Sequence, residues 1–140
     1  MKNRITIRLK DHQVKRLERE LEITQASQSA YIRNLIEEAL RSRDFPGIIF
    51  IDAPSGRQAT IAGTGLAVWE VLETLKSYDG DRNAMLEEYY PQLSERDIRV
   101  AMAYARKYRE EIERKVRRNE ELADEVFNER NDPLFHDPRL

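Results

Sequence analysis

Residues 4–10 read R-I-T-I-R-L-K, and this short stretch decides how the first third of the chain folds. Polar and apolar side chains alternate strictly along it, and its isoleucines and threonine are β-branched residues that strands favour. The alternation therefore predicts a half-buried strand with one face toward a core and the other toward solvent. The inward positions are Ile5, Ile7 and Leu9, and the outward positions are Arg4, Thr6, Arg8 and Lys10.

Two short amphipathic helices are predicted after this strand. The first begins at Asp11, a residue that favours N-caps, and it carries Val14, Leu17 and Leu21 on one face. Ser27 is expected to cap the second helix. The apolar stripe of that helix consists of Ile32, Leu35, Ile36, Ala39 and Leu40.

The predicted strand has no partner strand within this region. A lone strand leaves its backbone donors and acceptors unpaired beside exposed isoleucines. We therefore expect a dimer in which two chains pair these strands antiparallel over four helices. Such a two-stranded ribbon fits the major groove of DNA, with its arginine and threonine side chains facing the bases.

Residues 3–43 resemble the ribbon-helix-helix family of dimeric bacterial repressors and antitoxins, of the Arc and MetJ type. The resemblance rests on the alternating strand, on the helix lengths and on residues 27–32, which read S-Q-S-A-Y-I. It implies base contacts from Arg4, Thr6 and Arg8, and phosphate contacts at Lys10, the Ser27 hydroxyl and the amides of Gln28 and Ser29. The alternative is a surface strand whose arginines only solubilise the protein, with Ser27 acting only as a helix cap.

Charge is distributed unevenly along the chain. Residues 1–43 hold ten Lys or Arg and six Asp or Glu, a local charge of +4, whereas residues 44–140 hold fourteen and twenty, a local charge of −6. In a dimer these charges become +8 and −12. The first 43 residues are therefore predicted to present a basic face to DNA, while the acidic remainder stays away from it.

The middle of the chain, residues 48–108, is predicted to form a second domain after a linker at residues 45–47. Residues 47–51 and 58–61 are expected to pair as a hairpin, followed by helices over 66–78 and 81–89 and a third helix capped by Ser94. Gly63-Thr64-Gly65 predicts a tight turn before the first of these helices; no Lys-Ser or Lys-Thr follows it, as a P-loop would require.

This middle domain resembles antitoxin-associated helix-turn-helix proteins that accompany PIN-like toxins. The resemblance lies in residues 61–65, 68–72, 86–94, 97–99 and 103–105. It implies a partner protein, a PIN-like ribonuclease toxin. Members of that family usually carry R-G-T-R where this chain has Ala62-Gly63-Thr64-Gly65, so both arginines are missing.

Residues 95–127 contain no Gly or Pro and predict one uninterrupted helix. Its apolar stripe is narrow, so residues 109–140 are expected to project as an extended helix and a tail. The predicted toxin-binding residues are Ile112, Val116, Leu122, Val126, Phe127, Leu134 and Phe135. A self-paired helix in a dimer, or an over-long solvated helix, explains the same pattern.

Several classes of function find no support in the residues. The chain has no cysteine, its two histidines, His12 and His136, lie far apart, and no nucleophile motif is present. We therefore expect a protein that is not an enzyme and that uses no metal or cofactor. Neither a run of about 18 apolar residues nor a signal peptide is present, which predicts a cytoplasmic protein.

Taken together, these patterns predict a mainly α protein with a small amount of β structure. The expected function is that of an antitoxin: a dimer, or a larger even-numbered oligomer, that represses its own operon and neutralises a PIN-like ribonuclease. Two alternatives stay open at this point. One is a ribbon-helix-helix repressor without a toxin partner, and the other is a structural adaptor that does not bind DNA.

Overall fold

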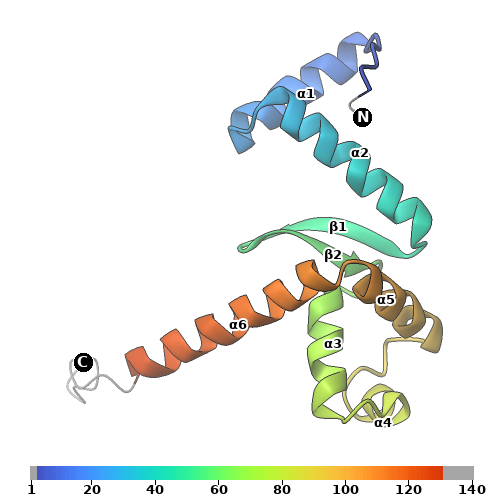
Figure 1. The fold of residues 1–140 in the computed structure, drawn as a ribbon, viewed down its shortest axis with the longest axis vertical. Coiled ribbons are helices and arrows are strands. Elements are labelled where there is room, and N and C mark those ends of the chain that lie inside the picture. The colour runs from blue at the N-terminus through green and yellow to red at the C-terminus, as the bar shows by residue number, and fades with distance from the viewer. Residues whose placement is uncertain (1–2, 131–140) are drawn as a thin grey trace. The chain divides into compact units, whose positions relative to one another are not determined.

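The computed structural model describes residues 3–130, and the chain divides into two compact units, Met1–Leu40 and Arg41–Leu140. Helices dominate the described residues and a small antiparallel sheet accompanies them, so the predicted class is confirmed (Figure 1). The boundary falls inside the second helix rather than at the predicted linker. The elements are α1 (Asp11–Thr24), α2 (Gln28–Asp44), β1 (Ile48–Ala53), β2 (Gly56–Ile61), α3 (Val68–Ser77), α4 (Arg82–Glu88), α5 (Glu95–Lys107) and α6 (Arg109–Arg130).

The first unit contains both predicted helices but not the predicted strand. Residues 3–10 form no strand in the single chain, and β1 and β2 are the only strands among residues 3–130. The first helix begins at Asp11 as predicted, but its N-cap residue is Lys10. The Lys10 N–H donates to Gln13 Oε1 at 2.9 Å. Ser27 caps α2 as predicted, since its hydroxyl accepts from the Ala30 N–H at 3.2 Å.

The second unit opens with the predicted hairpin, whose strands are longer than the pattern indicated. β1 and β2 pair in register from Ile48 opposite Ile61 to Ala53 opposite Gly56. Gly56 follows the turn with a φ of +108°, a conformation that favours glycine. One isolated bridge, between Thr60 and Ala67, attaches the chain before α3 to this sheet.

Residues 62–65 form the tight turn that the sequence predicts. Thr64 Oγ1 donates to the Ile61 carbonyl at 2.8 Å and accepts from the Leu66 N–H at 3.1 Å. Gly63 and Gly65 both have positive φ, of +78° and +71°. Both glycines therefore serve the turn that carries the chain from β2 into α3.

Two helices of the second unit begin with a side-chain cap, and the cap at Ser94 is the predicted one. Asp81 accepts from the Ala84 N–H at the start of α4. At the start of α5, the Asp97 N–H donates to Ser94 Oγ at 3.1 Å and the Ser94 N–H donates to Asp97 Oδ2 at 3.0 Å. These reciprocal bonds form a capping box and fix where α5 begins.

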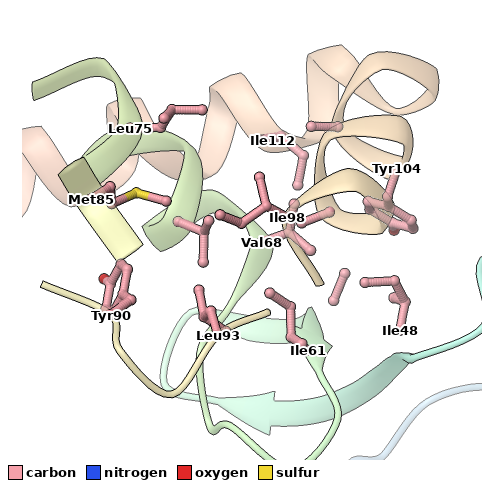
Figure 2. Packing of buried hydrophobic residues seen from close by; sticks show 14 residues of the cluster. Ile48, Ile61, Val68, Leu75, Met85, Tyr90, Leu93, Ile98, Tyr104 and Ile112 are labelled. Atoms are coloured by element: carbon pink, nitrogen blue, oxygen red, sulfur yellow. The ribbon is translucent and has the colours of Figure 1, made fainter. Parts of the chain in front are cut away.

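One hydrophobic core holds the second unit together (Figure 2). The hairpin contributes side chains from the ends of its strands that lie away from the turn, and α3 to α6 each contribute apolar side chains. The largest fully buried side chains in the cluster are Tyr104, Ile48, Met85, Ile98, Ile112, Val68 and Val71.

The long predicted helix is not continuous, so that prediction is wrong. It breaks at Tyr108, where φ is −111° and ψ is 44°, and α6 leaves α5 in a different direction (Figure 1). On a straight helix Ile98 and Ile112 would lie about 21 Å apart along the axis. The break brings both residues into one core. Their burial stabilises the turn at Tyr108, although the sequence has no glycine or proline there.

Truncation of α6 tests where this core ends. Ile112 is 1% exposed and Val126 is 48% exposed. We expect Ile112→Ala to lower the free energy of unfolding by about 2–5 kcal/mol. Val126→Ala is expected to change it by about 0.5 kcal/mol or less. Urea unfolding followed by circular dichroism measures both, and equal losses would contradict the placement of Ile112.

Candidate functional site

The predicted DNA-reading residues lie on the surface of the first unit. Arg4, Thr6, Arg8 and Lys10 are all exposed. Within residues 3–130 none of the three cations forms an ion pair with a carboxylate. Their side chains are thus accessible to a phosphate or to the edge of a base.

Several apolar side chains of the first unit that were predicted to face a core are exposed as well. Ile5 is 81% exposed and Ile7 is 68% exposed, and Leu17 is the one buried hydrophobic among residues 3–40. A unit of this size is not stable with so little burial. The other large exposed hydrophobics of this unit are Val14, Ile23, Leu35, Ile36 and Leu40.

The predicted phosphate contacts gather at the start of α2. The Ser27 hydroxyl accepts from the Ala30 N–H, and the Ser27 carbonyl accepts from the Tyr31 N–H at 3.0 Å. Gln28 and Ser29 are the first two residues of the helix and are exposed. Amides at these positions have no carbonyl one turn earlier within the helix, so they point toward solvent or a ligand. The Ser27 hydroxyl therefore caps α2 in the single chain, without a phosphate present.

The structure separates the predicted toxin-binding residues into two groups. Ile112 and Val116 are buried in their own unit, so they cannot form a docking surface and this part of the prediction is wrong. Leu122, Val126 and Phe127 are exposed on the second half of α6. Leu134 and Phe135 lie outside the described residues.

A polar cluster that the sequence patterns did not indicate lies where α5 meets α6. The buried Tyr104 hydroxyl donates to Glu111 Oε2 at 2.8 Å and accepts from Arg41 Nη1 at 2.9 Å. Arg41 also donates to Glu111 Oε1 at 3.1 Å, and its guanidinium carbon lies 3.8 Å above the Tyr108 ring. No sequence pattern indicated the cluster because Arg41 lies 63 positions from Tyr104 and 70 positions from Glu111.

Aromatic rings complete this cluster around Tyr104. Phe45 meets the Tyr104 ring edge-on with centroids 5.4 Å apart, and Tyr108 lies 4.7 Å from it. Phe45 belongs to the segment predicted as a linker, yet it packs into the second unit. Burial raises the pKa of the Tyr104 phenol; the hydrogen bond from Arg41 lowers it, and the Glu111 carboxylate raises it again. The phenol is therefore a structural donor that stays protonated.

Among residues 3–130, no group of three or more His, Cys, Asp or Glu side chains is placed to hold a metal ion. No helix in the described range has the length and apolar character needed to cross a bilayer.

Comparison with known protein families gives a match within the second unit. Residues 54–105 match the model of a family described as a protein of unknown function, DUF433. The match covers less than half of the chain, from the hairpin turn to within α5. No curated protein and no solved structure matches the chain. The matched region lies within the predicted second domain and supplies no activity for it.

Removal of one hydroxyl tests the polar cluster. Tyr104→Phe leaves Glu111 and Arg41 each short of a partner, so we expect it to lower the free energy of unfolding by about 1–3 kcal/mol. Tyr89→Phe makes the same change at a side chain that is 58% exposed, and it is expected to cost about 0.5 kcal/mol or less.

The same pair of variants gives a signed pH dependence. Because the pKa of Tyr104 is raised above 10.0, the folded chain keeps a proton that the unfolded chain releases. Stability from this group is complete below pH 10 and falls as the pH rises further. Urea unfolding between pH 8 and 11 should show a shallower fall for Tyr104→Phe than for Tyr89→Phe. Parallel curves would contradict this role of Tyr104.

Proposed function

We propose that this protein is a dimeric, DNA-binding antitoxin that represses its own operon and neutralises a PIN-like ribonuclease toxin. The observation that carries the proposal is the exposure of seven large apolar side chains among residues 3–40 of the first unit beside accessible arginines. Binding to operator DNA places the action of the protein in the cytoplasm.

The dimer is supported by what the first unit lacks. Ile5 and Ile7 alternate with Arg4, Thr6 and Arg8 along a segment that has no strand partner among residues 3–130. Pairing this segment with its copy would satisfy the backbone groups of both chains and cover both sets of isoleucines. In that arrangement the arginines of both chains share one surface, as the resemblance to ribbon-helix-helix proteins implies.

The DNA target is supported by charge and by side-chain chemistry. Arginine makes paired hydrogen bonds to guanine, and threonine contacts the thymine methyl group. The local charge of residues 1–43 is +4 per chain, and a dimer doubles it. The exposed amides of Gln28 and Ser29 add a place for a phosphate at the start of α2.

The toxin partner is supported by the resemblance of residues 48–108 to antitoxin-associated domains and by the exposed end of α6. Leu122, Val126 and Phe127 offer apolar contact area on a helix that extends past its own core. Ile112 and Val116 are excluded from this surface because they are buried in the second unit. An amphipathic helix that docks into a groove of a partner is a common mode of recognition.

Removal of a base-reading side chain tests the DNA-binding part. We expect Arg8→Ala to weaken binding to the promoter region of the protein's own gene by about 1–3 kcal/mol. Wild-type binding should fall steeply with salt. Arg117→Ala removes the same charge from the second unit and should leave affinity unchanged. Fluorescence anisotropy over a salt series measures affinity, and sedimentation equilibrium should give an even number of chains for all three proteins.

Equal affinities for wild type and Arg8→Ala, without salt dependence, would overturn the DNA-binding part. A dimer that binds no DNA would favour the structural adaptor instead.

A second pair of variants tests the toxin-binding part. Val126→Asp places a charge in the exposed apolar patch, so we expect it to weaken suppression of the toxin encoded in the adjacent reading frame while promoter binding stays intact. Asn128→Asp adds the same charge on the opposite side of α6 and should suppress growth arrest like wild type. Co-expression growth assays measure suppression.

The opposite pattern is expected of Arg8→Ala, which should still suppress the toxin. Full suppression by Val126→Asp would contradict the assigned surface. Absence of a toxic neighbour would favour a repressor without a toxin partner.

A further inference from the structure

A basic groove lies in the second unit, between the hairpin, α3 and α6. Its volume is about 360 Å³. Strand β2 contributes Arg57, α3 contributes Trp69, and α6 contributes three cations and one apolar residue. These α6 residues are Arg114, Lys115, Arg118 and Leu122.

The groove carries a net positive charge because four cations and one carboxylate line it, and that carboxylate is hydrogen-bonded within the unit. Glu111 lines the groove, but one of its oxygens accepts from Arg41 and the other from Tyr104. In contrast, Arg114, Lys115 and Arg118 form no ion pair with any carboxylate of residues 3–130. Three cations therefore converge without compensation inside a part of the chain whose overall charge is negative.

Arg57, the fourth cation that lines the groove, is bound to the hairpin and is not one of these three uncompensated cations. Arg57 donates to Asp52 Oδ1 at 3.1 Å and to the Phe50 carbonyl at 3.1 Å. These bonds fix its guanidinium against the hairpin, so it forms a rigid edge of the groove.

An apolar contact surface adjoins the cations. Trp69 is half-buried, and its Nε1 donates to Gln58 Oε1 at 3.3 Å, which holds the indole in one orientation. Leu122 lines the groove one helical turn beyond Arg118, and Val126 is exposed one turn further along α6. The groove therefore offers positive charge and apolar surface side by side.

We propose that this groove binds a short acidic segment of a partner protein, with carboxylates on Arg114, Lys115 and Arg118 and an apolar side chain against Trp69 and Leu122. The inference rests on the proposed function in that the second unit holds a protein partner, and it names the chemistry of the segment that is recognised. Carboxylates suit these cations because the charges match and arginine can bind a carboxylate through two hydrogen bonds.

A protein segment fits the groove better than a nucleic acid does. Residues 44–140 carry a local charge of −6, which repels a long polyanion but matters less to a segment of a few residues. Leu122 and Val126 extend the surface with apolar area, which a phosphate backbone does not use.

Peptide titration of the full-length chain tests the groove. Trp69 is the single tryptophan of the chain, so its fluorescence reports occupancy. The probe is acetyl-Asp-Glu-Leu-Asp-Phe-amide, and the matched control peptide is acetyl-Asn-Gln-Leu-Asn-Phe-amide. We expect saturable binding of the acidic peptide that weakens with salt, and at least tenfold weaker binding of the neutral one.

Two triple variants separate the groove from general charge. Arg114→Gln, Lys115→Gln and Arg118→Gln together should weaken binding of the acidic peptide at least tenfold. Lys76→Gln, Arg99→Gln and Arg117→Gln remove the same charge from exposed positions outside the groove and should leave affinity unchanged. Thermal unfolding establishes that both variants are folded.

The outcomes divide clearly. Absence of acidic-peptide binding, equal binding of the two peptides, or equal effects of the two triple variants would overturn the groove. Tighter binding of a thymidine oligonucleotide than of the acidic peptide would overturn it in favour of nucleic acid. The antitoxin proposal is tested separately, because the titration uses neither promoter DNA nor toxin. The residues varied in the antitoxin tests, Val126 and Arg8, lie outside the groove.

Discussion

The buried phenol of Tyr104 is the contact on which the second unit depends. Its hydroxyl joins Arg41, at the end of α2, to Glu111, in the first turn of α6, while its ring packs against Phe45 and Tyr108. Because Glu111 and Ile112 are neighbours, the bond that holds the carboxylate also holds Ile112 in the core. The chain can therefore turn at Tyr108 without a helix-breaking residue, since burial on both sides of the turn outweighs the loss of straight helix.

The same bond leaves the basic groove uncompensated. Both oxygens of Glu111 are used inside the unit, so the carboxylate that could neutralise Arg114, Lys115 and Arg118 faces Arg41 and Tyr104 instead. A contact that fixes the fold thus also sets the electrostatics of a surface. In an acidic part of the chain, this local excess of positive charge is what distinguishes one concave surface from the rest.

The sequence predicted best those features that depend on neighbours in the chain. The caps at Ser27 and Ser94, the turn at Thr64 and the hairpin each follow from residues a few positions apart, and all are present. The break at Tyr108 and the burial of Ile112 depend on contacts across the fold, and periodicity alone cannot encode them. The Arg41 cluster was missed for the same reason, because it joins residues more than 60 positions apart.

The two units solve the shortage of apolar residues in different ways. The second unit buries its own set by bending a helix back onto the hairpin and α3. The first unit leaves Ile5, Ile7 and most of its helix stripes exposed, and its first segment has no strand to pair with among residues 3–130. The proposed backbone pairing with a second chain would satisfy both needs at once, since it would form the missing sheet and cover the isoleucines. In that sheet the alternation at residues 4–10 would place every arginine on the opposite face, so the same step that completes the fold would also assemble the surface proposed to read DNA.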